Sequence, residues 1–297
     1  MEQGLATGGT GQGTVARARD GYLSGGPDAF SKEDLIMNVA VLQLEVNADR
    51  TKDERMVHAM DILESMYRDN RHPQLVLLPE IWGTGFFNFE NYQKESEELK
   101  GQTYFAFAPL AEKLGCYILT GSFVEREGSD LFNTSLLIDP EGNIAARYRK
   151  IHLFGYKSRE PEVLTPGRDI TVVGTKFGTW GITTCYDLRF PELYRAMVDK
   201  GAEGFLVPAA WPINRLDHWT IFNKARAVEN QCYLISCNCA GSHGGATFGG
   251  HSMVVDPWGI AVASGGDKET VVWANIDLEE VEKSRRTFTA LKDRVFK

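Results

Sequence analysis

Short apolar runs alternate with amphipathic segments along most of the chain. Runs rich in β-branched residues and bounded by turn residues predict strands, and apolar residues three or four positions apart predict helices. The expected strands are residues 37–46, 74–78, 116–124, 133–138, 144–148, 171–173, 180–184, 204–207, 232–238, 250–255, 260–263 and 270–276. The expected helices are residues 53–68 and 97–114, a helix beginning at Pro191, and residues 216–230 and 278–285.

Two pairs of these strands are joined by tight turns. Asp139-Pro140-Glu141-Gly142 connects 133–138 to 144–148, and Asp256-Pro257-Trp258-Gly259 connects 250–255 to 260–263, so both pairs predict hairpins. Strands otherwise alternate with helices in both halves of the chain. A doubly wound sheet would not need these hairpins, whereas two sheets packed face to face and covered outside by helices accommodate both features. We therefore predict an α/β fold, a four-layer α-β-β-α sandwich forming one domain over residues 35–297.

The first 34 residues have a different character. They are rich in Gly, Ala, Ser and Thr and show no apolar period, which predicts a disordered N-terminal extension. Arg17 and Arg19 are not followed by an apolar segment, so the stretch does not resemble a secretory signal.

Composition and charge narrow the possible functions. The hydrophobic share of 43% and the aromatic share of 11% are typical of a globular domain. The net charge of −8 comes without a basic cluster, which disfavours nucleic acid or an anionic membrane surface as a partner. No apolar run approaches the ~20 residues that span a bilayer.

Five cysteines, an odd number, do not suggest a disulfide framework, and they favour a reducing compartment, the cytoplasm. Cys237 and Cys239, with His243 and His251 downstream, could suggest a metal site. A second closely spaced pair of ligands is missing, so the sequence predicts no metal.

One cysteine lies where chemistry is expected. Cys185 follows the predicted strand 180–184, and the helix beginning at Pro191 follows closely. Such a strand-to-helix turn can present a nucleophile beside backbone N–H groups; the alternative is a buried structural cysteine. Glu80 and Lys150 likewise come just after predicted strands, although acidic and basic residues at such positions are often merely solvated.

Taken together, the segments LLPEIW, YRKIHLF and TTCYDLRFPELYR resemble motifs of the nitrilase (carbon–nitrogen hydrolase) superfamily. The resemblance extends from Met37 to Lys297. It implies an α-β-β-α sandwich, usually paired into dimers, and a catalytic triad of Glu80, Lys150 and Cys185.

The resemblance also implies roles for these residues. Glu80 would take the proton of Cys185 as sulfur attacks an amide carbonyl, and would later activate water. Lys150 and the backbone N–H of Tyr186 would stabilise the oxyanion. A second glutamate, Glu160 by alignment although Glu162 lies nearby, would orient Lys150 or the substrate. The family requires no metal or organic cofactor.

Residues beyond the triad point to one branch of the superfamily. Nitrile-cleaving members typically carry Trp-Glu after the cysteine, whereas Tyr186-Asp187 stands here and favours an amide. The segment Pro208-Ala209-Ala210-Trp211-Pro212 and the residues that follow resemble bacterial ω-amidase-type proteins. These hydrolyse the terminal amide of short dicarboxylate monoamides such as 2-oxoglutaramate and succinamate, releasing ammonia.

This branch implies a small acyl pocket. Trp211 with Phe86 or Phe87 could line it, although aromatics at such places often belong to the core. Arg189 or Arg215 could bind a substrate carboxylate, although Arg189 could instead tie its turn to Asp187 or Glu192.

Other functions remain open at this level. The alternatives are an N-carbamoyl amide hydrolase or aliphatic amidase with the same triad, and a non-catalytic interaction module of the same fold. Residues 287–291 replace a Pro-Val-Phe segment found in many ω-amidase-like chains, which leaves substrate length and dimer packing open. His218 is interpreted as a structural hydrogen-bond partner at a helix start.

Overall fold

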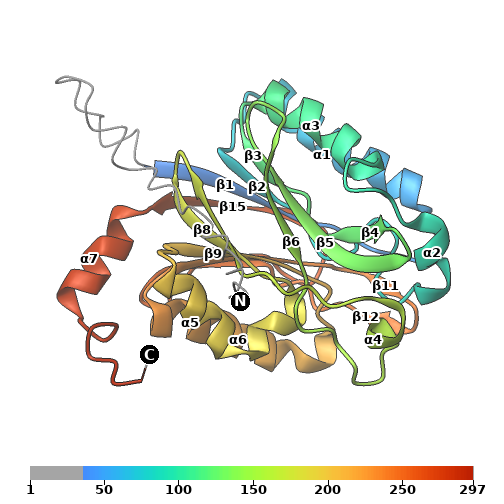
Figure 1. Ribbon diagram of the computed structural model, residues 1–297. Helices are drawn as coiled ribbons and strands as arrows, with labels where there is room; N and C mark the ends of the chain where they lie inside the picture. Colours follow the sequence, from blue (N-terminus) through green and yellow to red (C-terminus); the bar gives the residue numbers. More distant parts are fainter. Residues whose placement is uncertain (1–35, 297) are drawn as a thin grey trace, which may run out of the picture.

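The computed structural model describes residues 36–296 and contains two large β-sheets that pack face to face (Figure 1). The first sheet has the strand order β15-β1-β2-β3-β5-β4, with β6 also paired to β5, and the second has the order β14-β13-β10-β9-β8-β7. The extension predicted for residues 1–34 lies outside the described residues, and the domain boundary at residue 35 stays a prediction.

The first sheet is formed by β1 (Ile36–Gln43), β2 (Leu75–Leu77), β3 (Tyr117–Leu119), β4 (Phe123–Glu127), β5 (Asp130–Ile138), β6 (Ile144–Arg149) and β15 (Thr270–Asp277). The second is formed by β7 (Thr171–Thr175), β8 (Gly178–Ile182), β9 (Gly204–Ala209), β10 (Tyr233–Asn238), β13 (Met253–Val255) and β14 (Ala261–Ser264). A small hairpin joins β11 (Ser242–His243) to β12 (Ala246–Thr247). The helices are α1 (Lys52–Arg68), α2 (Tyr92–Glu95), α3 (Gln102–Leu114), α4 (Glu160–Val163), α5 (Pro191–Asp199), α6 (Leu216–Asn230) and α7 (Glu279–Thr287).

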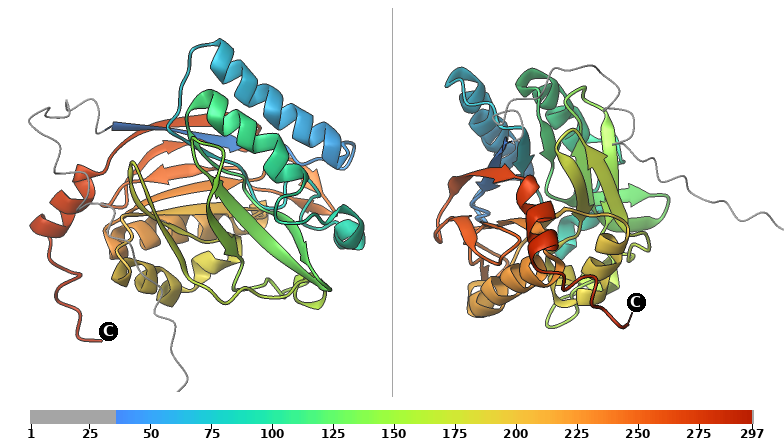
Figure 2. Two further views of the ribbon diagram at one scale, coloured as in Figure 1. Left: turned by 45° about the horizontal axis from the view of Figure 1, so that its top comes forward. Right: turned by 90° about the vertical axis from the view of Figure 1, so that its left-hand side faces the viewer.

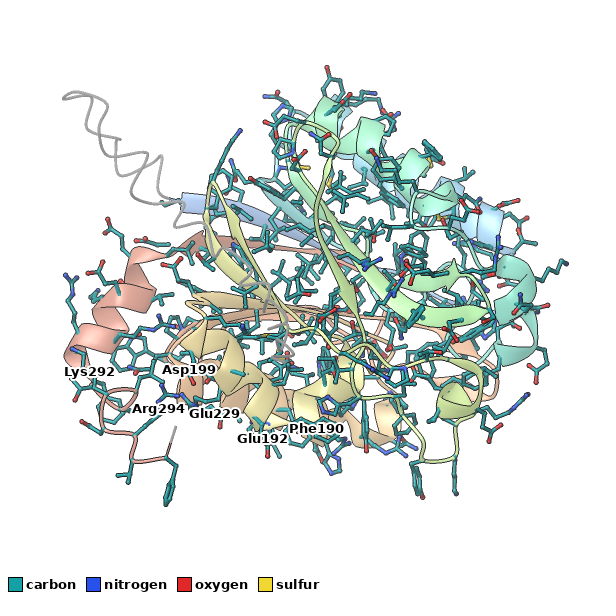
Figure 3. All side chains as sticks on the ribbon, viewed as in Figure 1. Phe190, Glu192, Asp199, Glu229, Lys292 and Arg294 are labelled. Atoms are coloured by element: carbon teal, nitrogen blue, oxygen red, sulfur yellow. The ribbon has the colours of Figure 1, made fainter. Side chains whose placement is uncertain are left out.

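Helices cover the outer face of each sheet. The two views of Figure 2, together with Figure 1, place α1 and α3 over the first sheet and α5 and α6 over the second. Figure 3 shows side chains filling the spaces between these layers. The predicted four-layer α-β-β-α sandwich is therefore confirmed.

Three apolar clusters correspond to the three interfaces of the sandwich. The central cluster joins the two sheets and includes Val41 and Leu77 from the first and Ile182 and Ile235 from the second, all fully buried. The other two clusters lie under α1 and α3 and under α5 and α6. A strand buried on both faces loses the polar alternation of an exposed strand, which explains why β1 and β2 are nearly continuous apolar runs.

Local signals account for several helix boundaries. Thr51 and Glu54 form a reciprocal capping box at the start of α1, and Pro191 occupies the first position of α5. Helix α6 spans residues 216–230, as the periodicity predicted, and ends where Gln231 takes a left-handed conformation (φ 48°). Within residues 36–296 no helix combines the length and the apolar character needed to cross a bilayer.

Several predicted strands are shorter in the structure, such as 250–255, which begins at Met253, and two predicted elements differ more. The helix expected at 97–114 begins at Gln102, because the Glu97 carboxylate accepts the N–H of Thr103 (2.5 Å) and acts as a cap from outside the helix. The strand expected at 116–124 is broken into β3 and β4 at Gly121, whose φ is 71°. A Cβ at Gly121 would lie 1.9 Å from the carbonyl oxygen of Pro79, so the chain needs glycine there to pass beside the segment that carries Glu80.

Candidate active site

The three predicted triad residues come from the ends of strands in both sheets. Glu80 follows β2 and Lys150 follows β6 in the first sheet, whereas Cys185 follows β8 in the second. The segments after β2 and β9 are joined, since the N–H of Glu80 bonds to the carbonyl of Ala209 (3.2 Å) and the N–H of Ala210 to Glu80 Oε2 (2.9 Å). The site thus forms where the two sheets meet at their strand ends.

Lys150 is the centre of a buried ion cluster. Its Nζ lies 2.8 Å from Glu80 Oε1 and 3.0 and 2.9 Å from the two carboxylate oxygens of Glu160. All three side chains have no exposed surface. Glu162, the alternative to Glu160, is exposed and bonds to Arg159 instead. The structure therefore brings Glu160, and not Glu162, to Lys150.

Sequence reasoning missed Asn133, which joins the two carboxylates of this cluster. Its Nδ2 donates to Glu80 Oε1 (2.9 Å) and to Glu160 Oε1 (3.1 Å). Asn133 is 1% exposed and lies inside β5. The available signal was the polar run Asn133-Thr134-Ser135 in a strand whose other half is apolar, because polar side chains that become buried need partners.

Cys185 lies at a tight turn with unusual backbone geometry. Its φ is 48°, in the left-handed region, and it begins a short 3-10 helix, η3 (Cys185–Arg189). Non-glycine residues with positive φ are uncommon and are enriched at functional sites. The thiol lies near the Glu80 carboxylate and the Ala210 N–H. Tyr186, predicted to supply an oxyanion N–H, follows in η3, and that role stays a prediction.

The electrostatics of the site follow from burial and from opposite charges in contact. Burial disfavours the ammonium of Lys150, but Glu160 and Glu80 outweigh it and raise the pKa of Lys150 above its ordinary value. Burial and then Glu80 raise the pKa of the Cys185 thiol, against the effect of Lys150. Burial also raises the pKa of Glu160, which Lys150 opposes. These directions leave the Cys185 thiol protonated and Lys150 as a fixed ammonium.

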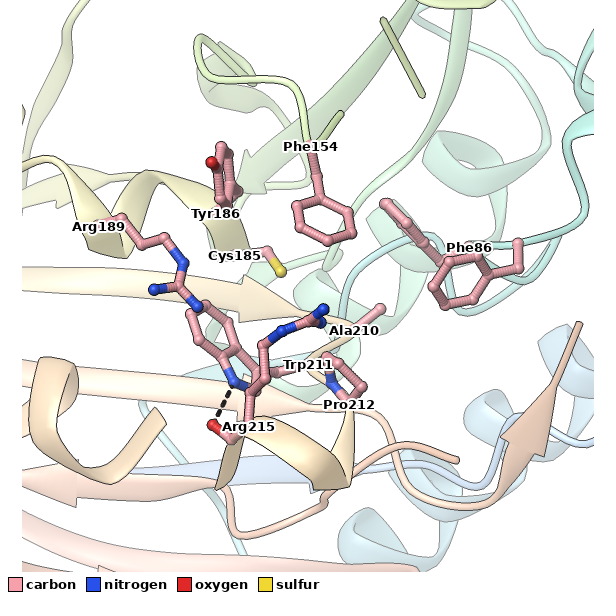
Figure 4. A pocket seen from close by; sticks show the side chains of 10 residues that line it. Phe86, Phe154, Cys185, Tyr186, Arg189, Ala210, Trp211, Pro212 and Arg215 are labelled. Carbon is pink, nitrogen blue, oxygen red and sulfur yellow. Dashed lines mark hydrogen bonds between the residues drawn. The ribbon is translucent and has the colours of Figure 1, made fainter. Parts of the chain in front are cut away.

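A pocket opens directly on Cys185 (Figure 4). Every residue predicted to contact substrate lines it, and so do residues that were not predicted to do so. The lining residues are Phe86, Phe87, Phe154, Cys185, Tyr186, Arg189, Ala210, Trp211, Pro212 and Arg215.

Two guanidinium groups lie in this pocket among aromatic rings. The Arg215 guanidinium carbon is 5.5 and 5.2 Å from the ring centres of Phe154 and Tyr156, and that of Arg189 is 5.0 Å from the ring centre of Trp211. Burial is the main cause that lowers the pKa of Arg189. Within residues 36–296 neither arginine forms an ion pair with a carboxylate. Both cations are thus available to an anionic ligand.

The structural alternative for Arg189 is not observed. Instead of bonding to Asp187 or Glu192, Arg189 Nη2 lies 3.2 Å from Nδ1 of His218, which projects from the first turn of α6. His218 therefore lies at a helix start and is a hydrogen-bond neighbour of Arg189, in agreement with the structural role predicted for it.

Known proteins share this architecture. Residues 38–286 match the family described as carbon-nitrogen hydrolase. A 2-oxoglutaramate amidase of Paenarthrobacter nicotinovorans is 33% identical over 266 residues, covering 87% of this chain and 89% of that protein. A 2-oxoglutaramate amidase of Bacillus subtilis is 37% identical over 228 residues, covering 76% and 86%.

Solved structures agree with these sequence matches. The crystal structure of Saccharomyces cerevisiae Nit3, a member of branch 10 of the nitrilase superfamily, superposes with a TM-score of 0.80 at 30% identity. The match covers 88% of this chain and 97% of Nit3. The sandwich is thus that of the nitrilase superfamily. The chain belongs to the carbon-nitrogen hydrolase family and is an amide-hydrolysing enzyme.

Proposed function

We propose that the enzyme hydrolyses the terminal amide of short dicarboxylate monoamides, such as 2-oxoglutaramate and succinamate, through a thioester on Cys185. The observation that carries this proposal is the pairing of a small apolar pocket at the thiol with two guanidinium groups that have no carboxylate partner among residues 36–296. The names of the two bacterial relatives support the same substrate class.

The first half of the reaction forms the thioester. Glu80 takes the proton of the Cys185 thiol as sulfur bonds to the amide carbon, and the carbonyl oxygen becomes an oxyanion. The Lys150 ammonium and the Tyr186 N–H stabilise that charge. Glu80 then passes its proton to the amide nitrogen, the C–N bond breaks and ammonia leaves.

The second half regenerates the thiol. Glu80 takes a proton from water as its oxygen attacks the thioester carbon, and the C–S bond breaks. The sulfur receives that proton and the dicarboxylic acid is released. Throughout, Glu160 holds Lys150 in place by its two oxygens. The prediction that no metal or organic cofactor takes part is unchanged by this scheme.

The arginines give the substrate its orientation in this proposal. A carboxylate at the far end of a short chain would meet Arg189 or Arg215 when its amide lies at Cys185, because all three residues line one pocket. Trp211 and Phe86 would pack on the intervening methylene groups. A neutral amide would lack the charge-assisted hydrogen bonds, which contribute about 1.5–3 kcal/mol each.

Ammonia release from four substrates tests this proposal. We expect hydrolysis of succinamate and 2-oxoglutaramate, and kcat/KM at least about tenfold lower for propionamide, which carries no carboxylate. Carbamoyl-β-alanine keeps a carboxylate but has a ureido group in place of the amide, so its expected slower hydrolysis tests the reacting group and not the charge. Arg189→Met and Arg215→Met each remove one candidate partner of the substrate carboxylate. The variant that lacks the true partner should show a higher KM for succinamate and an unchanged rate on propionamide. Arg159→Met is the control, since Arg159 is exposed and does not line the pocket.

The other outcomes of this panel separate the alternatives. A preference for carbamoyl-β-alanine would indicate the carbamoyl hydrolase, and a preference for propionamide would indicate the aliphatic amidase. Wild-type protein that is folded but inactive on all four would support the non-catalytic module.

We also propose that the enzyme is a homodimer. Five exposed apolar side chains lie on α6 and on the β13–β14 hairpin beside it; this α6–β14 patch consists of Ile221, Val228, Trp258, Ile260 and Val262. The two elements are in contact, because a Cβ at Gly259 would lie 3.2 Å from Val228 Cβ. Contiguous exposed apolar surface is typical of association sites.

Light scattering of the purified protein tests the dimer. The expected mass is twice the 33.1 kDa of the chain, and Ile221→Asp with Ile260→Asp should reduce it to that of one chain. Val57→Asp is the control, because Val57 is exposed on α1, over the other sheet. A wild-type monomer at micromolar concentration would contradict the proposal.

The cytoplasmic location stays a prediction, to which the five free cysteines lend support and which cell fractionation tests.

A further inference from the structure

A buried carboxylate, that of Asp187, lies two residues beyond the nucleophile Cys185 and accepts hydrogen bonds from both sides. Asp187 is 0% exposed. Its Oδ2 accepts the Tyr148 hydroxyl (2.6 Å) and the Thr184 N–H (2.9 Å). Its Oδ1 accepts the N–H of His152 (3.0 Å) and lies 2.7 Å from His152 Nδ1. Because an ionised carboxylate only accepts, His152 Nδ1 carries the proton.

These donors belong to two segments that carry different members of the triad. Tyr148 and His152 lie two residues before and two residues after Lys150, at the end of β6 in the first sheet. Thr184 directly precedes Cys185, after β8 in the second sheet. The Asp187 carboxylate therefore connects the segment of the ammonium to the turn of the nucleophile.

The rings reinforce this connection. The imidazole of His152 stacks on Phe190, with centres 3.7 Å apart and planes 8° from parallel. Phe190, labelled in Figure 3, immediately precedes α5. The N–H of Ile151 also bonds to the Tyr148 hydroxyl (3.3 Å). Contacts from both sides of Lys150 thus converge on the Cys185 turn.

We infer that Asp187, with Tyr148 and His152, is a positioning device that sets the separation of Lys150 from Cys185. The inference rests on the proposed function, in which Lys150 stabilises the oxyanion that forms on the carbon bonded to Cys185. Two groups on different sheets must be held together for that step, and a misplacement of about 1 Å can lower a rate by ~10²-fold. Asp187 does not line the pocket, so it acts through these two residues and not on the substrate.

The geometry also explains why an acid occupies this position. Each carboxylate oxygen faces a backbone N–H, that of Thr184 on one side and that of His152 on the other. In an asparagine, either orientation of the amide would point its NH₂ group at one of these backbone donors, which cannot reverse. Only a carboxylate accepts on both sides. Among residues 36–296 no lysine or arginine pairs with Asp187, and its one basic neighbour is His152.

A pair of tyrosine variants tests the inference. Tyr148→Phe removes a buried hydroxyl that bonds to Asp187 at 2.6 Å, and Tyr194→Phe removes a buried hydroxyl that bonds to Thr183 at 2.7 Å beside the same turn. Both should lower the urea midpoint to a similar extent. Only Tyr148→Phe should lower kcat for the preferred amide, by about 10- to 100-fold with KM unchanged.

Two substitutions of His152 should differ in kcat, which a merely structural role of this residue would not produce. The amide nitrogen of asparagine can take the place of Nδ1, which contacts Asp187, whereas that of glutamine takes the place of Nε2. His152→Asn should therefore retain most of the wild-type kcat, and His152→Gln should lose it. His152 is partly exposed (29%), so both proteins should fold.

The outcomes distinguish this inference from the proposed function. If wild-type protein is active and Tyr148→Phe loses no more kcat than Tyr194→Phe, or if the two His152 variants are equal, the positioning role is wrong and the proposed function stands. Wild-type protein that releases no ammonia from any of the amides would overturn both.

Discussion

Replacing Cys185 by alanine should abolish ammonia release, lowering kcat by about 10⁴- to 10⁶-fold, the range seen when an acyl-transfer enzyme loses one member of its catalytic triad. Without the sulfur of Cys185 no thioester forms, and a water molecule in its place would be a much weaker nucleophile toward the amide carbon. Steady-state ammonia release measures the loss. Intact-mass spectrometry of rapidly quenched reactions should also detect an acyl adduct on the wild-type chain and none on Cys185→Ala.

The matched control for this experiment is Cys239→Ala. Cys239 is also buried, and its sulfur lies 3.6 Å from the backbone oxygen of Glu80, but it does not line the pocket. We expect Cys239→Ala to lose about 1 kcal/mol of stability and to keep its kcat. Substantial activity in Cys185→Ala would show that the thioester mechanism is wrong.

Replacing Lys150 by methionine should be the second most damaging change, for two separable reasons. The oxyanion would lose its fixed cation, which should lower kcat by about 10²- to 10³-fold. Glu80 and Glu160 would remain buried without their partner, and breaking a buried ion pair on one side costs about 3–5 kcal/mol. Urea unfolding and steady-state kinetics measure the two effects independently.

The loss of stability should depend on pH in a defined direction. Lys150 opposes the rise in the pKa of Glu160, so its removal moves that folded-state pKa further above the ordinary 4.5. A carboxyl group with a raised pKa binds its proton more tightly in the folded state, so the folded state loses stability as the pH rises through this window. The deficit of Lys150→Met relative to wild type should therefore shrink as the pH falls from 8 toward 5.

Lys52→Met supplies the control for a buried lysine outside the site. Lys52 Nζ lies 2.9 Å from Glu97 Oε1, with both side chains largely buried (12% and 7% exposed). Its loss should lower the urea midpoint and leave kcat unchanged. Wild-type kinetics in Lys150→Met would contradict the assigned role of Lys150 whatever its stability.

Much of the fold and the location of the site could be predicted from the sequence. Glu80 and Cys185 follow short apolar runs, and Lys150 follows a strand that the turn at residues 139–142 indicated, so these strand ends were visible. Helix α6 was predicted over residues 216–230 as observed. Errors occurred where a distant side chain or backbone intervenes. Glu97 caps α3 from outside the helix, and the approach of Pro79 forces the break at Gly121.

Asn133 and Asp187 show where prediction from sequence stopped. Asn133 stands in a strand with no local partner, and its two acceptors are 53 and 27 residues away along the chain. Asp187 lies within the motif that identified the cysteine, but its link to Tyr148 crosses 39 residues and joins the two sheets. Neither contact leaves a trace in periodicity or composition.

The sequence by itself determined the strand and helix pattern and the class of fold, because apolar period, caps and turn residues act over a few positions. The triad residues followed from the resemblance of three short motifs to those of the nitrilase superfamily. Only the tertiary structure decided which acidic residue meets Lys150, which arginines reach the pocket, and how the Cys185 turn is tied to the end of β6. Those contacts depend on how two sheets pack. The N–H of Ala210 reaches Glu80 across 130 residues only because β2 and β9 end at the same edge of the sandwich.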